Sequence, residues 1–221
     1  MTFEDFSVTG ALYHVVSIID LEKTLAEGIH FDDKITYFDK YYDFHNYFDK
    51  YRTDNIPYWV VRKKAIFASM NFKEDHNWHS HTALLKVKVD TKKCWVCNEN
   101  KANILFEPFI LQNIKGFEEA KKFIEEKGAK MVEEYWLDSL SMDENMRVRR
   151  DKEKGYDAEV LIFHDIPPED IECLFIISDH SIMSPDKWLY YFNTELICPK
   201  SPAPKGIGCQ RAVKFSMEST K

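Results

Sequence analysis

The 221-residue chain is poor in residues that interrupt or cross-link a fold, with 7 Gly, 8 Pro and 5 Cys. So few glycines and prolines argue against a disordered or low-complexity chain. An odd number of cysteines at low density argues against a disulfide scaffold and fits a reducing compartment. No apolar run approaches the ~20 residues that span a bilayer, and the N-terminus lacks the basic and apolar regions of a secretory signal. We therefore expect a cytoplasmic protein with no membrane partner.

The chain also lacks an excess of positive charge. Its formal net charge is −7, whereas a dedicated nucleic-acid binder is usually positive. Two runs, residues 62–64 and 147–154, are locally basic. A solvated surface is the simpler interpretation of both runs. A negative protein can nevertheless present a positive cleft, so nucleic acid stays open as a partner.

Aromatic residues are abundant: 16 Phe, 11 Tyr and 5 Trp. With 44% hydrophobic residues, the chain can bury the core of one domain. We predict a single domain over residues 1–199 and a C-terminal tail or strap over residues 200–221. Aromatic residues recur every three or four positions in residues 37–51, which predicts an amphipathic helix. That helix could be part of the core or a lid over a site.

Several short segments are rich in β-formers, namely residues 11–16, 82–89, 158–163 and 171–177. Gly116 and Gly128 bracket a predicted helix over 117–127. The segments lack the regular βαβ alternation of a doubly wound fold, and no Gly-rich dinucleotide or P-loop fingerprint is present. The pattern favours an α+β fold with a split, mostly antiparallel β-sheet and peripheral helices.

Two segments carry the first candidate residues. Asp157 and Glu159 lie two apart at the entrance of a predicted strand, so they share a face, roughly 6–7 Å apart. They are either a catalytic pair at the mouth of a buried strand or solvated strand-end acids. His14 follows Tyr13 among apolar residues, where it is either a ligand-binding histidine or a satisfied core histidine.

Two further patterns could suggest a metal. Histidines 76, 79 and 81 lie close in sequence, but neither a helix nor a strand places all three on one face, so we prefer a surface loop. Cys94 and Cys97 form a CxxC pair, but Cys198 and Cys209, far downstream, are too widely spaced to supply the second pair of a zinc site. No thioredoxin-like pattern surrounds the pair. We therefore expect no metal.

Three segments taken in order resemble the ADP-ribosyltransferase superfamily. Residues 12–17, with 20–28, are similar to the opening of the DarT-type DNA ADP-ribosyltransferases and of their tRNA 2′-phosphotransferase relatives. Residues 65–70, Ala-Ile-Phe-Ala-Ser-Met, resemble the middle motif of the poly(ADP-ribose) polymerase branch. Residues 158–162, with 166–171, are similar to the late glutamate strand of the DarT-type group. The resemblance covers roughly residues 11–178.

The resemblance implies an α+β ADP-ribosyltransferase-like fold and NAD as co-substrate. Members cleave the bond between nicotinamide and ribose through an oxocarbenium-like transition state. Glu159 would stabilise that positive charge, and Asp157 would accept a proton from the incoming nucleophile or orient it. The remaining implied NAD-binding residues are Tyr13, His14, Arg62, Phe67 and Ser69. His14 would bind a ribose hydroxyl, and Arg62 or a neighbouring lysine would pair with the pyrophosphate.

Two departures bear on activity. The polymerase branch stacks a tyrosine on nicotinamide where this chain has Ile66, so Tyr58, Trp59 or Phe67 would have to replace it. The glycine that often follows the first-motif histidine is Val15.

The resemblance thus implies a mono-ADP-ribosyltransferase that modifies DNA, RNA or protein, by analogy a bacterial toxin or defence effector. The main alternative is a catalytically silent module that binds NAD, ADP-ribose or nucleic acid. RNA 2′-phosphate transfer and a metal-dependent hydrolase are further alternatives.

Overall fold

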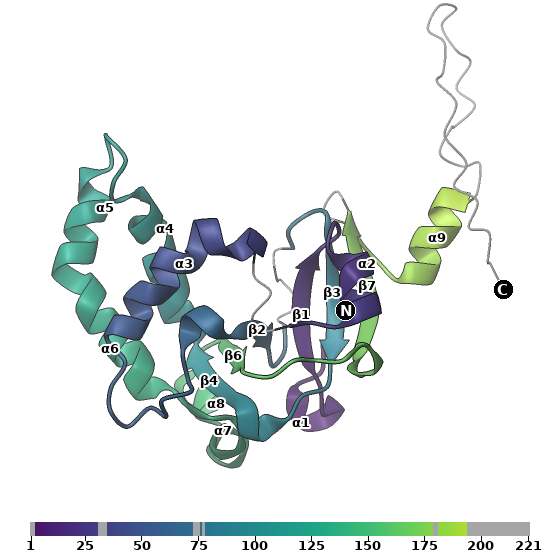
Figure 1. Cartoon of the computed structure of the whole chain (residues 1–221), viewed down its shortest axis with the longest axis horizontal. Coiled ribbons are helices and arrows are strands. Elements are labelled where there is room, and N and C mark those ends of the chain that lie inside the picture. Colours follow the sequence, from purple (N-terminus) through teal and green to yellow (C-terminus); the bar gives the residue numbers. More distant parts are fainter. Residues whose placement is uncertain (1–2, 31–34, 73–75, 77, 179–180, 194–221) are drawn as a thin grey trace, which may run out of the picture. The chain divides into compact units, whose positions relative to one another are not determined.

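A computed structural model of the chain describes residues 3–30, 35–72, 76, 78–178 and 181–193 (Figure 1). The chain forms two units, residues 1–185 and 186–221. The first unit ends at Pro185, and the domain boundary predicted at residue 199 stays a prediction. The second unit starts within helix α9, Pro185–Asn193. The predicted tail, 200–221, lies outside the described residues.

The first unit is built on an eight-stranded sheet in the order β5-β4-β6-β2-β1-β3-β7-β8. All neighbouring strands pair antiparallel, so the expected α+β class with a mostly antiparallel sheet is confirmed. The strands are β1 Leu12–Ser17, β2 Ile66–Ser69, β3 Thr82–Val87, β4 Cys94–Asn98, β5 Leu140–Ser141, β6 Ala158–Ile162, β7 Ile171–Ser178 and β8 Ser181–Met183.

The sheet is divided between β1 and β2. These two strands share one register pair, Tyr13 with Ser69, whereas β1 pairs with β3 over its whole length. Beyond Tyr13, the Nδ1 atom of His14 lies 2.7 Å from the carbonyl oxygen of Phe67. The His14 side chain therefore hydrogen-bonds this carbonyl group close to the point where β1 and β2 separate. The sheet consists of two halves, β5-β4-β6-β2 and β1-β3-β7-β8, which meet at this split.

The helices of the first unit include α3, which confirms the helix predicted from the aromatic residues at 37–51. They are α1 Phe6–Thr9, α2 Leu21–Glu27, α3 Ile35–Lys50, α4 Glu99–Leu111, α5 Glu118–Phe123, α6 Ala129–Asp138, α7 Met142–Val148 and α8 Arg150–Lys154, with short turns η1 Arg62–Lys64, η2 Thr91–Lys93, η3 Ile124–Gly128 and η4 Pro168–Asp170.

Gly128 does not end the predicted helix over 117–127. The chain continues from α5 through a π-turn, η3, into α6 with helical dihedral angles at Gly128. A Cβ atom at this position would lie 2.5 Å from the hydroxyl oxygen of Tyr47. A side chain at this position would therefore force Tyr47 of α3 to shift, so the glycine reflects the close approach of α3 and not a turn.

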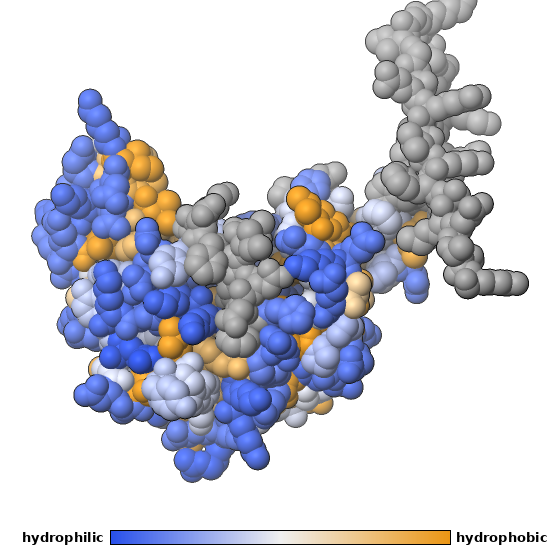
Figure 2. Space-filling model, in the orientation of Figure 1, coloured by the Kyte–Doolittle hydropathy of each residue, from blue (hydrophilic) through white to orange (hydrophobic). Residues whose placement is uncertain are grey.

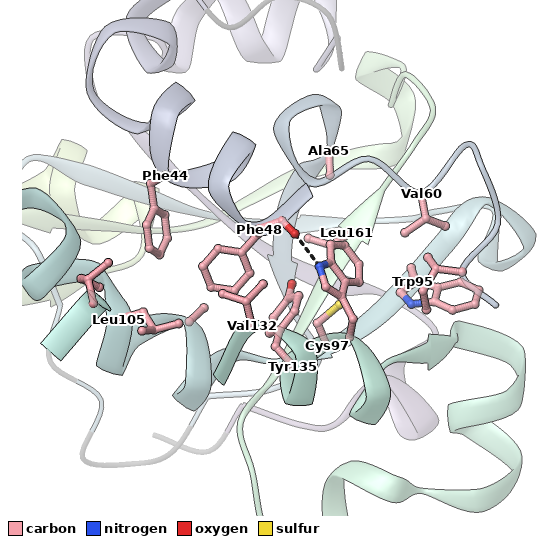
Figure 3. Packing of buried hydrophobic residues seen from close by; sticks show 14 residues of the cluster. Phe44, Phe48, Val60, Ala65, Trp95, Cys97, Leu105, Val132, Tyr135 and Leu161 are labelled. Atoms are coloured by element: carbon pink, nitrogen blue, oxygen red, sulfur yellow. Dashed lines mark hydrogen bonds between the residues drawn. The ribbon is translucent and has the colours of Figure 1, made fainter. Parts of the chain in front are cut away.

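The larger hydrophobic core lies between α3, α4, α6 and the β4-β6 half of the sheet (Figure 3). Phe44 and Phe48 of α3 are almost completely buried in it, and each such ring contributes about 1.5–3 kcal/mol by its burial. The indole Nε1 of Trp136 donates to the carbonyl oxygen of Phe48 at 2.7 Å, drawn as the dashed line in Figure 3. Phe44, Tyr47, Phe48 and Tyr51 of the aromatic segment therefore belong to the core or pack against it, whereas Tyr42 is exposed.

A second, smaller core covers the other half of the sheet. It contains Tyr13, Leu84 and Ile177, with Phe3 and Phe72 packed against them. The face of the molecule seen in Figure 2 is mostly hydrophilic, and its apolar side chains gather in separate small patches.

Candidate functional site

One row of residues runs across the sheet between the two cores. The register pairs Cys97 with Glu159, Glu159 with Ser69, and Ser69 with Tyr13. Residues paired in this way point to the same face of an antiparallel sheet. Cys97 belongs to the larger core and Tyr13 to the smaller one. Glu159 and Ser69 therefore occupy the middle of the row, next to the split.

Local sequence explains how Glu159 reaches this position. Helix α8 ends at Gly155, which adopts the left-handed conformation at φ +69°. This conformation suits glycine and terminates the helix. Two residues then lead into β6, whose β-branched and apolar residues are buried on both faces. Side chains alternate between the two faces along β6, so Glu159 points to the face that carries Ser69.

Glu159 forms a buried ion pair. Its Oε1 atom accepts a hydrogen bond from Nη1 of Arg62 at 2.6 Å and another from the hydroxyl of Tyr135 at 2.8 Å. The side chains of Arg62 and Glu159 are only 4% and 8% exposed. Buried charges persist only when they are paired and hydrogen-bonded. The three residues are therefore one polar unit within an apolar region.

The second carboxylate oxygen of Glu159 is in a different situation. Oε2 has no hydrogen bond to a described residue, and it is not among the fully buried polar atoms that lack a partner. Arg62 and Tyr135 hold Oε1, so Oε2 is the oxygen left for a further hydrogen bond.

Arg62 is enclosed by rings. Its guanidinium carbon lies 4.9 Å from the ring centre of Phe48, 4.8 Å from that of Phe67 and 5.1 Å from that of Tyr135. Burial alone lowers the pKa of Arg62, but the adjacent Glu159 carboxylate outweighs it and holds that pKa well above its ordinary value. The charge of Arg62 is committed to Glu159, so in this arrangement it is not presented to a pyrophosphate.

Arg62 is also fixed through its backbone. The carboxylate of Asp49, in α3, accepts hydrogen bonds from the backbone N–H groups of Arg62 at 2.7 Å and Lys63 at 3.2 Å. These bonds tie the C-terminal part of α3 to η1. The position of the guanidinium therefore depends on the packing of α3.

His14 lies at the split. By strand alternation it is Tyr13, not His14, that shares the face of Ser69 and Glu159. Because a carbonyl oxygen can only accept, the contact of Nδ1 with the Phe67 oxygen places the proton on Nδ1. In the neutral ring, Nε2 then carries the lone pair.

Of the three aromatic residues proposed to replace the missing tyrosine, Phe67 lies at this site. Tyr58 is 86% exposed, and Trp59 packs against Trp95 in the larger core. Phe67 is in β2 beside the split, and the ring of His45 stacks on it at 4.9 Å between centres and 22° between planes. A flat ring therefore already lies against Phe67 in this structure.

Tyr13 is a core residue. It is 4% exposed, and its hydroxyl donates to the carbonyl oxygen of Glu4 at 2.9 Å. The rings of Phe3 and Phe72 lie 5.7 and 5.9 Å from it. Its side chain thus supports the start of β1 and does not point into the space around Glu159.

Asp157 lies just before β6, with its carboxylate engaged by a neighbour. Its Oδ2 accepts from the amide of Asn100 at 3.0 Å, and its backbone N–H donates to the amide oxygen of Asn100 at 2.7 Å. Asp157 also lines a cavity of about 260 Å³, together with Asn71, Phe72 and Lys152. The structure therefore places Asp157 beside an open space.

Glu99 is a site residue that the sequence analysis did not single out. Its backbone N–H donates to the carbonyl oxygen of Asp157 at 2.9 Å. Burial raises the pKa of Glu99 to about 7, assisted by the charges of Glu159 and Asp157. Glu99 is the first residue of α4 and follows Asn98, the last residue of β4. An acid at the end of a buried strand was the signal that pointed to Asp157 and Glu159, and it applied equally here.

The two basic runs are largely engaged within the protein. Arg149 forms ion pairs with Asp5 at 2.7 Å and Asp151 at 2.6 Å, and Lys154 pairs with Asp138 at 2.5 Å. In the other run, Arg62 is buried. The described part of the chain therefore does not present these runs as a continuous positive surface.

The metal-like patterns do not converge. Within the described ranges, no group of three His, Cys, Asp or Glu residues is placed to bind a metal ion. Cys94 and Cys97 are both buried, and burial raises the pKa of each thiol. Histidines 76, 79 and 81 lie outside the described helices and strands.

The chain matches no protein-family model, and neither a curated protein nor a solved structure similar to it was found. Among the described helices, none combines the length and the apolar character needed to cross a bilayer.

Proposed function

We propose that this protein is an NAD-dependent mono-ADP-ribosyltransferase with Glu159 as its catalytic residue. The observation that carries the proposal is the position of the three segments that resemble the superfamily. They form β1, β2 and β6, and these strands are neighbours in the order β6-β2-β1. His14, Phe67, Ser69 and Glu159, which lie far apart in sequence, thereby gather around the split in the sheet.

The polar groups at the split suit NAD as a substrate. The Glu159 carboxylate would accept a hydrogen bond from a hydroxyl of the nicotinamide ribose, and His14, whose side chain lies on the other face at the split, would hydrogen-bond a ribose hydroxyl of the bound NAD. Phe67 offers the flat apolar surface that the nicotinamide ring requires, on which His45 now stacks. Phe67 would therefore take the part that a tyrosine plays in the polymerase branch.

The proposed chemistry is cleavage of the bond between nicotinamide and C1′ of the ribose. Positive charge develops on the ribose as this bond breaks, and the Glu159 carboxylate would stabilise it. Arg62 and Tyr135 hold that carboxylate before the substrate arrives, so little reorganisation is needed during the reaction. They act as positioning residues, because both contact Oε1 and leave Oε2 to the substrate.

The arrangement of basic side chains favours some acceptors over others. The net charge is −7, and both basic runs contain residues committed to internal ion pairs. A polyphosphate chain is bound mainly through accessible Lys and Arg residues. The acceptor supported best is therefore a protein or a small molecule.

The test measures nicotinamide released from NAD, with sodium azide present as a small nucleophile. Glu159→Gln preserves the shape of the side chain and removes its charge. We expect the variant to be slower by about 10²–10³, the usual cost of losing one such electrostatic contact. Glu172→Gln is the matched control, because Glu172 is an exposed glutamate on β7, and its rate should equal that of the unmodified protein.

A second candidate function is a non-catalytic module that binds NAD or ADP-ribose. It is favoured by the burial of Glu159, whose side chain is 8% exposed and already paired with Arg62. Calorimetric titration with NAD in the same samples separates the two functions. Binding without nicotinamide release would support the module, and absence of both would contradict the two proposals together.

A further inference from the structure

His45 of α3 covers the ring of Phe67. The centre of the imidazole lies 4.9 Å from the centre of the Phe67 ring, and the two planes are inclined by 22°. His45 is 3% exposed, whereas Phe67 in β2 is half-buried. The imidazole therefore fills space between α3 and β2, beside a ring that solvent partly reaches.

The covered ring belongs to the surroundings of Glu159. The guanidinium carbon of Arg62 lies 4.8 Å from the centre of the Phe67 ring, and Nη1 of Arg62 lies 2.6 Å from Oε1 of Glu159. Phe67 and Ser69 are two apart in β2, so their side chains share a face, and Ser69 pairs with Glu159 of β6. The stacked imidazole therefore lies on the face of the sheet that carries Glu159.

The helix that carries His45 is anchored by groups other than its imidazole. The carbonyl oxygen of Phe48 accepts a hydrogen bond from Nε1 of Trp136 at 2.7 Å. The carboxylate of Asp49 accepts hydrogen bonds from two backbone N–H groups of η1 at 2.7 and 3.2 Å. These anchors lie on the C-terminal side of His45. The imidazole can therefore leave Phe67 while the C-terminal part of α3 stays in place.

We infer that His45 is an internal competitor for the nicotinamide ring of NAD, so that this structure shows the closed form of the site. The inference rests on the proposed function, in which Phe67 carries the nicotinamide ring. Imidazole and nicotinamide are both flat aromatic rings, and the same place on Phe67 can hold only one of them. Nicotinamide therefore stacks there only when the imidazole has left.

The competition has a defined effect on affinity. When only a fraction of the molecules can bind, the apparent dissociation constant is the intrinsic constant divided by that fraction. The stack of His45 on Phe67 favours the closed form, and an aromatic pair of this kind changes an equilibrium by about 2–10-fold. The imidazole should weaken NAD binding by about the same factor. The change is a side-chain movement and involves no covalent step.

The experiment is a calorimetric titration with NAD of the unmodified protein and three variants. His45→Ala removes the ring, and we expect it to bind NAD about 2–10 times more tightly. His45→Phe keeps a flat ring beside Phe67, so it should bind NAD no more tightly than the unmodified protein. Tyr42→Ala is the control for a change within α3, because Tyr42 is exposed on the same helix, and its affinity for NAD should be unchanged.

Two further measurements separate competition from a purely structural role. Lost packing alone would weaken NAD binding or leave it unchanged, so it does not account for tighter binding by His45→Ala. In the nicotinamide-release assay, the KM for NAD should fall in His45→Ala while kcat stays close to its original value, because the imidazole takes no part in the chemical step. In NMR spectra of the unmodified protein, NAD should shift the signals of the His45 ring protons as they leave the ring current of Phe67.

The outcomes distinguish this inference from the proposed function. If the unmodified protein binds NAD and His45→Ala binds it equally or more weakly, the inference is overturned and the proposed function stands. Unshifted His45 signals at saturating NAD would overturn the inference as well. If neither the unmodified protein nor His45→Ala binds NAD, the proposed function itself fails and the inference fails with it. Binding by His45→Ala alone would support both.

Discussion

Removal of the Arg62 guanidinium should expose how strongly this molecule depends on its buried ion pair. In Arg62→Met the apolar stem is largely preserved, but Glu159 keeps a buried negative charge whose ionic partner is gone. Breaking a buried pair in this way costs about 3–5 kcal/mol. The total free energy of unfolding of a domain is about 5–15 kcal/mol, so the variant should lose a large fraction of its stability.

The double variant Arg62→Met, Glu159→Gln provides the decisive comparison. It removes both charges, and Tyr135 can still donate to the amide oxygen that replaces Oε1. Replacement of both members of a buried pair is often neutral, so we expect the double variant to recover most of the loss. The measurement is the free energy of unfolding from urea titration at pH 7.

Arg147→Met is the control, because the Arg147 side chain is 74% exposed and 3.9 Å from its partner Glu144. Its unfolding free energy should change by less than about 0.5 kcal/mol. A loss of less than about 1 kcal/mol in the unfolding free energy of Arg62→Met would contradict a stabilising buried ion pair. So would a double variant whose loss equals the sum of the losses in the two single variants, since the two charges would then not be coupled.

Two further predictions concern packing and pH. Gly128→Ala places a Cβ atom 2.5 Å from the Tyr47 hydroxyl, so it should lower the melting temperature through a cost of about 1–3 kcal/mol. Addition of Tyr47→Phe removes this hydroxyl and should restore part of the lost stability. If the double variant recovers no stability, the clash lies elsewhere. The raised pKa of Glu99, about 7 when folded against about 4.3 when unfolded, means that its contribution to stability is present below pH 4.3 and is lost as pH rises through 7. Glu99→Gln should therefore gain stability relative to the unmodified protein between pH 5 and pH 8 in urea titrations, and a constant difference over that range would contradict the assignment.

Local patterns in the sequence were sufficient for the main elements. The periodic aromatic residues at 37–51 predicted α3, and the apolar runs ending near residues 163 and 177 predicted β6 and β7. These signals are local, because strand and helix periodicity depends on residues a few positions apart. The prediction that Gly128 ends a helix was wrong for the same reason. The close contact at Gly128 comes from Tyr47 of α3, which is far from it in the sequence.

The sequence by itself determined the α+β class and the acidic pair at the mouth of a buried strand, since both follow from residue type and spacing. Only the tertiary structure decided what surrounds that pair. Arg62 is 97 residues from Glu159, and the two meet because β2 and β6 pair in one register while α3 packs over them. Glu99 lies opposite Asp157 for a similar reason. Register and helix packing arise from the burial of the whole apolar face, which involves residues far apart in the sequence. For this reason Arg62, which the basic run 62–64 suggested to be a solvated surface residue, is the buried partner of Glu159.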